Sequence, residues 1–217
     1  AKETIKFIKD KKWNSALKSA SKIKDGEFKN LINWMYLKTT KNGASFNEYK
    51  NFIEQNSEYP RINRIRFLAE GKIYLRNNSP TSIINWFDKY PPLGGMGKIK
   101  LAEAYLEKGK TKEVQKLIKE GWETATISKN DLGYYRAKFK KFIDSEDHIR
   151  RADYLAWEKK YWDLKRMLKY LPKDQRALYN ARQILMSNSY GVDNAISKVP
   201  EYLKKDPGLE FDRLRWR

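Results

Sequence analysis

The chain contains no cysteine and only one histidine among its 217 residues. Without cysteine there is no disulfide framework, no thiolate metal site and no cysteine nucleophile. The absence of cysteine does not determine the cellular compartment of the protein. No apolar stretch approaches the roughly 20 residues that a membrane-spanning helix needs. A signal peptide is absent and the chain begins at Ala1 instead of Met, which predicts a processed or trimmed form.

Proline and acidic residues are also scarce. The seven prolines mostly mark helix boundaries, and 27 Asp and Glu against 46 Lys and Arg leave a formal charge of +19. Such an excess attracts anionic partners, which include nucleic acid, acidic lipid and acidic glycopeptides. Because lysine is spread along the chain without a dense block, the same charge also fits solvated helix faces. Charge alone therefore does not identify a partner.

Apolar residues make up 40% of the chain and aromatic residues 14%, which is ample for a packed core and excludes a disordered chain. These residues recur at three- and four-residue spacing, and no segment shows sustained two-residue alternation. We therefore predict an all-α protein. The predicted helical segments cover residues 13–23, 28–37, 45–53, 60–75, 80–90, 98–109, 114–122, 128–142, 149–157, 162–171, 177–188, 195–199 and 207–216.

Turn and capping signals separate these segments. Ser45 with Glu48 has the spacing of a capping box, and Ser79-Pro80 predicts a cap followed by proline in the first turn. Helices of about 10–16 residues joined by short turns are typical of helical hairpins stacked side by side. The sequence predicts one α-superhelical domain over residues 1–217, an irregular solenoid of tetratricopeptide-like hairpins.

The stretch Ile83–Gly97 contains the strongest helix-terminating signal in the chain. Pro91-Pro92 predicts the end of one helix, and Gly94, Gly95 and Gly97 predict a free turn before a new helix near Lys98. The segment also resembles part of a phosphate-binding loop. However, Pro92 stands in place of the first required glycine, Ile99 replaces Ser or Thr, and no strand precedes it. A structural turn is the preferred interpretation.

His148 is the one candidate for metal or proton chemistry. It follows Glu146-Asp147, and a carboxylate–histidine pair can bind a metal or move a proton. No second His or Cys completes a zinc site. A helix cap at Ser145, with Glu146 and Asp147 at the positive helix end, explains the acids more simply. No serine lies in a nucleophile-elbow motif.

Other chemistry is weakly indicated. Spacing does not exclude a carboxylate pair for glycosidic chemistry, but the acids lie on lysine-rich faces. Tyr134-Tyr135-Arg136 and Arg213–Arg217 interleave aromatic and basic residues, as in nucleic-acid binders. Stacking platforms need exposed rings, whereas these follow helical core spacing. We therefore predict no catalytic, cofactor-binding or metal-binding residue, no cofactor, and no nucleic-acid partner.

Several stretches, taken in order, form a pattern that covers essentially the whole chain, although no single motif decides it. They are Trp13-x-x-Ala16-Leu17-x-x-Ala20, Ile32-Asn-Trp34, Glu48-Tyr49-x-x-Phe52-Ile53, Tyr59-Pro60, Ala69-Glu70, Trp86-Phe87-x-x-x-Pro91-Pro92 with Gly97, Leu101-Ala102 with Gly109, Trp122, His148-x-x-Arg151-x-Asp153-x-Leu155-x-Trp157, Ala181-Arg182-x-x-Leu185, and Pro207-Gly208-Leu-x-Phe211-Asp212-Arg213-x-Arg215-Trp216-Arg217. This pattern resembles the N-terminal α-superhelical domain of the soluble lytic murein transglycosylases, a family that usually has Trp-Pro where Tyr59-Pro60 stands here.

The resemblance implies a periplasmic protein whose full-length form cleaves peptidoglycan strands to 1,6-anhydromuramic products. In that family one glutamate, followed by serine, does the acid and base work in a separate C-terminal lysozyme-like domain. This chain has neither a Glu-Ser pair nor the family's Gly-Leu-Met-Gln block, so no catalytic residue is carried over. The implied partners are peptidoglycan and that catalytic domain, with this chain as the first portion of a longer superhelix.

Two alternatives remain open. The chain can be a free-standing helical-repeat scaffold for a protein partner, with no role on glycan. It can also be a basic helical nucleic-acid binder, which the lack of a recognisable binding motif makes less favoured.

Overall fold

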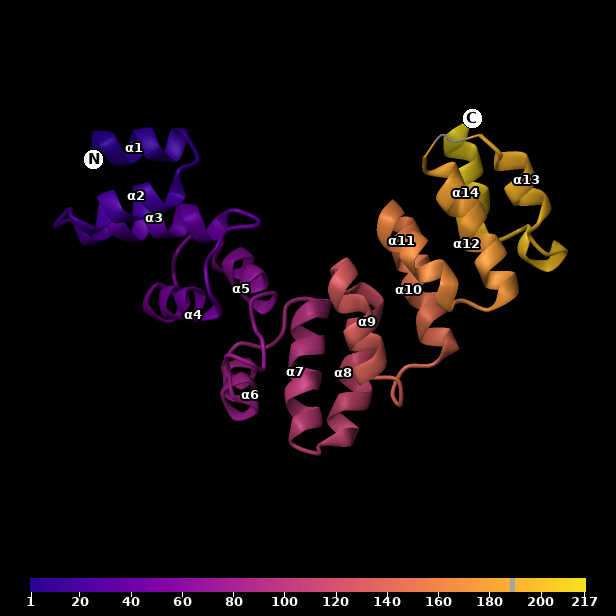
Figure 1. Cartoon of the computed structure of the whole chain (residues 1–217), viewed down its shortest axis with the longest axis horizontal. Coiled ribbons are helices and arrows are strands. Elements are labelled where there is room, and N and C mark those ends of the chain that lie inside the picture. Colours follow the sequence, from indigo (N-terminus) through magenta and orange to yellow (C-terminus); the bar gives the residue numbers. More distant parts are fainter. Residues whose placement is uncertain (188–189) are drawn as a thin grey trace. The chain divides into compact units, whose positions relative to one another are not determined.

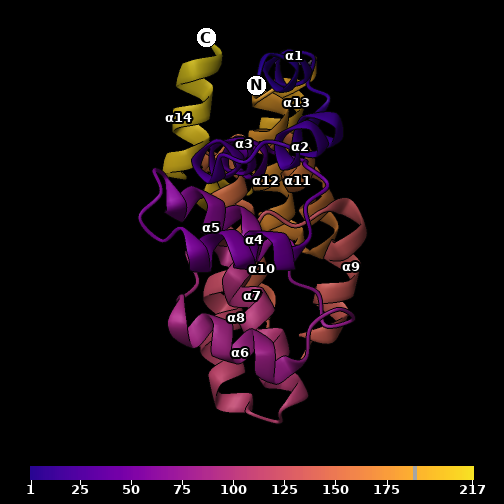
Figure 2. The same cartoon turned by 90° about the vertical axis from the view of Figure 1, so that its left-hand side faces the viewer.

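The computed structural model describes residues 1–187 and 190–217, and every element in them is a helix (Figure 1, Figure 2). The prediction of an all-α protein is confirmed. The described residues form fourteen α-helices and two short 3-10 helices. The chain folds as two compact units, the first unit Ala1–Asn78 and the second unit Ser79–Arg217. The single domain over residues 1–217 stays a prediction, and each unit is described by itself.

The first unit contains five helices, each packed on its neighbours in the chain. They are α1 (Lys2–Lys9), α2 (Trp13–Ser21), α3 (Gly26–Lys38), α4 (Phe46–Gln55) and α5 (Ile62–Glu70). The sequence analysis assigned no element before Trp13. The signal for α1 was available, because Thr4, Phe7 and Ile8 have helical spacing; Thr4 is buried, and Phe7 and Ile8 pack against the buried cluster of α2 and α3.

The second unit contains the remaining helices, and one apolar core extends from Ile99 to Leu209. They are α6 (Pro80–Lys89), α7 (Gly95–Glu107), α8 (Thr111–Thr124), α9 (Lys129–Lys138), α10 (Ser145–Trp157), α11 (Tyr161–Met167), η1 (Leu168–Tyr170), α12 (Lys173–Leu185), α13 (Val192–Ser197), η2 (Glu201–Leu203) and α14 (Pro207–Trp216). Packing follows chain order: α6 lies on α7, α7 on α8, α8 on α10, α10 on α11 and α12, and α12 on α13 and α14. None of the described helices is long and apolar enough to span a bilayer.

Local capping signals predicted several helix starts correctly. Ser45 Oγ accepts from the Glu48 amide at 3.3 Å, and the Glu48 carboxylate accepts from the Ser45 amide at 2.8 Å. Ser79 Oγ accepts from the Ser82 amide at 3.1 Å, and Pro80 opens α6. Each cap satisfies an amide that has no partner within its helix. These starts depend on residues three apart, so no tertiary information was needed.

Some predicted boundaries were wrong, because a buried apolar residue need not lie in a helix. The helix expected over 60–75 begins at Ile62 and ends at Glu70, and Ile73 is buried from the turn that follows. The helix expected over 128–142 stops at Lys138, and Phe139 is buried just beyond it. For the helix expected to reach Asn188, α12 ends at Leu185, and Asn188 lies outside the described residues.

The predicted free turn at Gly94–Gly97 is also corrected. α7 already begins at Gly95, and among the described glycines left-handed backbone occurs only at Gly109 and Gly191. A Cβ at Gly95 would lie 2.5 Å from the Ala125 amide nitrogen, and one at Gly121 would lie 2.9 Å from the Gly95 carbonyl oxygen. These glycines let α7 and α8 approach closely; Figure 1 shows the two helices side by side. Close packing, and not backbone freedom, explains them.

One hairpin turn occurs three times, between α1 and α2, α7 and α8, and α10 and α11. The residues Lys11, Gly109 and Lys159 have φ values of 56°, 70° and 54°. In each case the next amide donates back to a carbonyl five residues earlier, the longer hydrogen bond of a Schellman motif. These bonds are Lys12 to Phe7 at 2.8 Å, Lys110 to Tyr105 at 3.0 Å and Lys160 to Leu155 at 2.8 Å.

The same three turns also place equivalent side chains in the core. Five residues after each left-handed residue stand Ala16, Val114 and Leu164, and all three are fully buried. A fixed turn followed by a buried residue at a fixed distance sets the angle and depth at which the second helix returns. The two units therefore use the same hairpin unit, once in the first and twice in the second.

Candidate functional site

The structure gives the phosphate-loop candidate a packing role. Gly95 faces the end of α8, and Lys98 Nζ forms an ion pair with Glu120 at 2.6 Å. This ion pair lowers the pKa of Glu120. The segment therefore contributes to the packing of α7 on α8.

His148 packs between two aromatic rings. Its ring centroid lies 5.6 Å from that of Trp122 and 5.9 Å from that of Tyr170, and its Nδ1 accepts from Trp122 Nε1 at 3.2 Å. Burial, and then the nearby Arg136 guanidinium, lower the pKa of His148. A neutral ring is what an Nδ1 acceptor requires. Among the described residues no group of three or more His, Asp or Glu is arranged to hold a metal ion.

The cap of α10 differs from the prediction at Ser145. Asp144 is the cap: it accepts from the Asp147 amide at 3.1 Å, and Asp147 accepts from the Asp144 amide at 2.9 Å. Lys119 of α8 lies 3.1 Å from the Asp144 carboxylate and 3.2 Å from that of Asp147. The amide of Asp147 and the ammonium of Lys119 lower the pKa of Asp144 to about 2. These acids therefore join α8 to α10.

Trp122 is the centre of the joint between α8 and α10. Besides His148, Arg151 reaches it from α10: the guanidinium lies 5.3 Å from the indole centroid and donates to the Trp122 carbonyl oxygen. Burial lowers the pKa of Arg151 to about 10. We call Trp122, His148 and Arg151 the tryptophan joint.

A second joint forms around Arg182 of α12, whose side chain is 0% exposed. Its Nε donates to Asp212 of α14 at 2.8 Å and its Nη1 to Asp153 of α10 at 2.7 Å. Burial opposes the charged form, but the bonds to the two carboxylates outweigh it and raise the pKa of Arg182. A Cβ at Gly208 would overlap the guanidinium, so only glycine fits there. We call Arg182, Asp153, Asp212 and Gly208 the arginine joint.

The aromatic and basic segments considered for nucleic acid are partly absorbed by packing. Tyr135 is buried and accepts from Lys100 Nζ at 2.6 Å, while Tyr134 donates to Glu103. Arg136 lies 4.6 Å from the ring centroid of Tyr170. The 134–136 segment therefore holds α9 against its neighbours. In the other segment, Leu214 is 73% exposed on α14.

One pocket of the first unit was not predicted from the sequence. It has a volume of about 280 Å³. Its lining residues are Ala44, Ser45, Phe46, Asn47, Lys72, Tyr74, Arg76, Asn77 and Asn78. We call it the asparagine pocket. The only signal in the sequence is the pair Asn77-Asn78, which lies between the helices predicted over residues 60–75 and 80–90.

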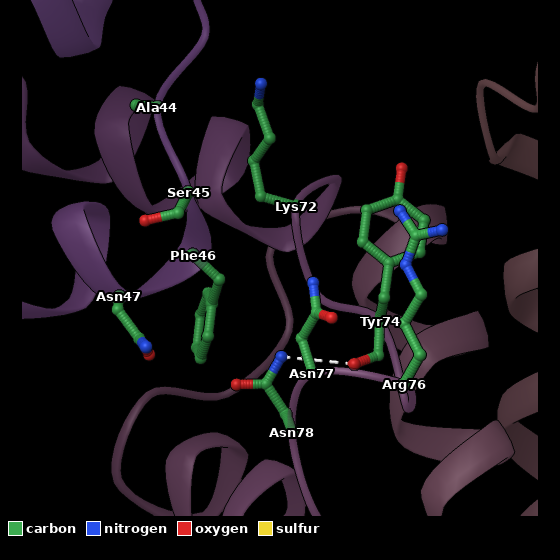
Figure 3. A pocket seen from close by; sticks show the side chains of 9 residues that line it. All are labelled: Ala44, Ser45, Phe46, Asn47, Lys72, Tyr74, Arg76, Asn77 and Asn78. Carbon is green, nitrogen blue, oxygen red and sulfur yellow. Dashed lines mark hydrogen bonds between the residues drawn. The ribbon is translucent and has the colours of Figure 1, made fainter.

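Two segments build the asparagine pocket, and Figure 3 shows them on opposite sides: the start of α4, and the residues that follow α5. The second segment is fixed by a tight turn in which the amides of Asn77 and Asn78 donate to the Tyr74 carbonyl oxygen at 3.0 and 3.1 Å. Asn78 Nδ2 donates to the same oxygen at 3.1 Å. Lys72 Nζ donates to the Asn42 carbonyl oxygen at 2.7 Å, which ties this segment to the loop before α4.

The lining of this pocket is basic and rich in carboxamides. It contains Lys72, Arg76 and three asparagines, and none of the nine lining residues carries a carboxylate. The Arg76 guanidinium lies 5.1 Å from the Tyr74 ring centroid, a cation–π distance that restricts where it points. The lining contains no carboxylate or imidazole, which are the side chains that most often act as general bases. Its cations and carboxamides are groups that bind a ligand through charge and hydrogen bonds.

Comparison of the chain with known protein families, with curated proteins and with solved structures found no match. The sequence and its own geometry therefore carry the functional argument. Three features stand out: the tryptophan joint and the arginine joint of the second unit, and the asparagine pocket of the first.

Proposed function

We propose that this chain is a non-catalytic superhelical module of a periplasmic lytic murein transglycosylase. The observation that carries the proposal is where the residues of the resemblance lie. Trp122, His148 and Arg151 meet in the tryptophan joint, and Arg182, Asp153, Asp212 and Gly208 meet in the arginine joint. Residues up to 59 positions apart in sequence, Asp153 and Asp212, thus form fixed joints between helices, as expected for a pattern that specifies a scaffold.

The three equivalent hairpin turns support the finer part of the proposal, an irregular superhelix of tetratricopeptide-like hairpins. In such a solenoid each hairpin contacts mainly its neighbours in the chain. The packing inside each unit follows that order. A strict array would need a constant repeat length, whereas Lys11, Gly109 and Lys159 are unevenly spaced.

In this proposal the chain positions peptidoglycan strands for a lysozyme-like domain that supplies the catalytic glutamate. The formal charge of +19 favours the acidic stem peptides of the strands. Attraction between exposed charges falls with ionic strength, with a screening length of about 8 Å at physiological salt. Binding through this surface is therefore expected to weaken as salt is raised.

Co-sedimentation with purified sacculi tests the proposal. The chain is expected to pellet with sacculi at low salt, and sodium chloride is expected to release it progressively. With chitin, which is a neutral glycan, the chain is expected to remain unbound in the supernatant. Absence of binding to sacculi at low salt would contradict the glycan role. Turnover assays on this chain alone are expected to release no anhydromuropeptide, and release would place catalysis inside the chain.

A helical-repeat scaffold for a protein partner is the second candidate. Exposed apolar side chains of the second unit favour it: Trp162 is 64% exposed and Leu214 73%. Large exposed apolar groups are typical of protein contact surfaces. The sedimentation experiment separates the two candidates, because a scaffold with no glycan role stays soluble with both sacculi and chitin.

A further inference from the structure

We propose that the asparagine pocket binds one carboxylate-bearing sugar residue. All the lining residues of the pocket belong to the first unit, and none of them takes part in the tryptophan joint or the arginine joint. The charge, hydrogen-bonding capacity and size of the pocket favour this ligand. Its link to peptidoglycan rests on the proposed function, whereas the ligand chemistry rests on the pocket alone.

The charge of the lining selects an anion. Lys72 and Arg76 contribute two positive charges, and the carboxylate of Glu48, which is not a lining residue, accepts from the amide and the hydroxyl of Ser45 at 2.8 Å. Lys72 uses one of its three donors on the Asn42 carbonyl oxygen, which holds the ammonium in place. Arg76 is exposed and presents a planar fork that suits a carboxylate.

The carboxamides select hydroxyl and acetamide groups. A carboxamide has donors and an acceptor, so it matches sugar hydroxyls, which also do both. Asn47 approaches from α4, and Asn77 and Asn78 lie between the two sides of the pocket in Figure 3. Tyr74 is partly exposed and adds apolar surface that a sugar ring can contact, whereas Phe46 is buried in the core.

Size distinguishes a sugar from a simple anion. Small-molecule sites commonly occupy roughly 300–1,000 Å³, and the asparagine pocket, at about 280 Å³, lies just below that range. One ring with its substituents suits this volume, and a long oligosaccharide exceeds it. Inorganic phosphate uses only the two cations and leaves the three asparagines without ligand partners. The combination of groups therefore favours a sugar acid over phosphate and over a neutral sugar.

Nuclear magnetic resonance titration of the full chain tests this inference. The probes are N-acetylmuramic acid and glucuronic acid, compared with N-acetylglucosamine, glucose, acetate and inorganic phosphate. Both sugar acids are expected to shift the amide signals of residues 45–47 and 72–78, and neutral sugars and simple anions to bind at least tenfold more weakly. Preference for N-acetylmuramic acid over glucuronic acid would identify muramic residues whose lactyl carboxylate carries no stem peptide as the source, and the reverse would identify a uronic-acid polymer.

Two pairs of matched variants place the binding in the pocket. Arg76→Gln is expected to weaken binding of the sugar acid about tenfold, as for one lost charge-assisted hydrogen bond. Its control, Lys24→Gln, removes the same charge at an exposed position outside the pocket and is expected to bind normally. Asn47→Asp adds a negative charge inside the pocket, and Asn51→Asp adds it one turn along the same helix, outside the lining.

Asn47→Asp is the sharper test, because it separates binding from folding. An acid in the first turn of α4 favours the helix, so this variant is expected to fold at least as well as the parent while losing the sugar acid. Equal binding by Asn47→Asp and Asn51→Asp, or equal affinity for phosphate and sugar acid, overturns the inference. If Asn47→Asp loses the sugar acid but still binds sacculi, the proposed function is retained independently of the pocket. If the parent chain binds the sugar acid but not sacculi, the pocket inference is supported and the proposed function is contradicted.

Discussion

Arg76 in the first unit and Arg182 in the second carry the same guanidinium into opposite surroundings. Arg76 is exposed at the rim of the asparagine pocket, 5.1 Å from the Tyr74 ring centroid. Arg182 is fully buried and bonded to Asp153 and Asp212. An exposed cation keeps its hydration and remains available to a ligand, whereas a buried one requires fixed carboxylates. The net charge of a chain therefore does not show which of its charged side chains stabilise the fold and which are available to a ligand.

Removing each arginine is expected to give the largest difference between the units. Arg182→Ala leaves two carboxylates without their partner and is expected to destabilise the second unit by about 3–5 kcal/mol. Arg76→Ala and Lys173→Ala, which remove exposed cations, are expected to stay within about 0.5 kcal/mol. Urea unfolding combined with peptide-resolved hydrogen exchange measures each unit separately. A similar loss for Arg76→Ala and Arg182→Ala would remove the distinction.

The second-largest effect is expected where α7 and α8 pack closely, at Gly95. Gly95→Ala places a methyl group against the backbone of Ala125 and is expected to destabilise by about 1–3 kcal/mol. Gly133, in α9, has nothing within 4 Å of an added Cβ. Gly133→Ala is therefore expected to stabilise by about 0.5–1 kcal/mol, because alanine favours the helix. Thermal unfolding of both variants checks the predicted opposite signs.

The tryptophan joint is expected to make the second unit sensitive to acid. The folded pKa of His148 lies below its ordinary value of 6.5, so the unfolded chain binds more protons as the pH falls below about 6.5. Stability is then lost on acidification, by at most about 1.4 kcal/mol per pH unit for one proton. His148→Gln retains an oxygen acceptor for Trp122 and is expected to flatten stability between pH 7 and 5. An unchanged profile would exclude His148 as the source.

The smallest expected effect concerns the turn that both units share. Lys11 and Lys159 hold left-handed backbone where Gly109 stands in the third copy. Lys11→Gly and Lys159→Gly are each expected to stabilise by about 0.5–1 kcal/mol, and Gly109→Lys to destabilise by as much. Calorimetry of the three variants measures these shifts. Unequal signs for Lys11→Gly and Lys159→Gly would show that the two turns are not equivalent.

Local signals in the sequence predicted the helical class and many helix starts. The capping box at Ser45 and Glu48 and the cap at Ser79 require only neighbours three residues apart. The stop before Pro91-Pro92 likewise follows from the missing amide of proline. Where a boundary depended on burial, as at Ile73 and Phe139, the apolar pattern extended the helix too far.

The candidate site was beyond such reasoning, because its groups come from segments separated in sequence. Asn47 and Asn77 line one pocket although they are 30 positions apart in the sequence, and only the packing of α4 and α5 brings them together. The sequence alone determined that the chain is helical, basic and free of cysteine chemistry. Tertiary structure decided that Gly95 packs against the end of α8, that His148 accepts from Trp122, and which arginines face water. Burial and pairing arise only between segments, and they decide whether a charge stabilises the fold or remains free for a ligand.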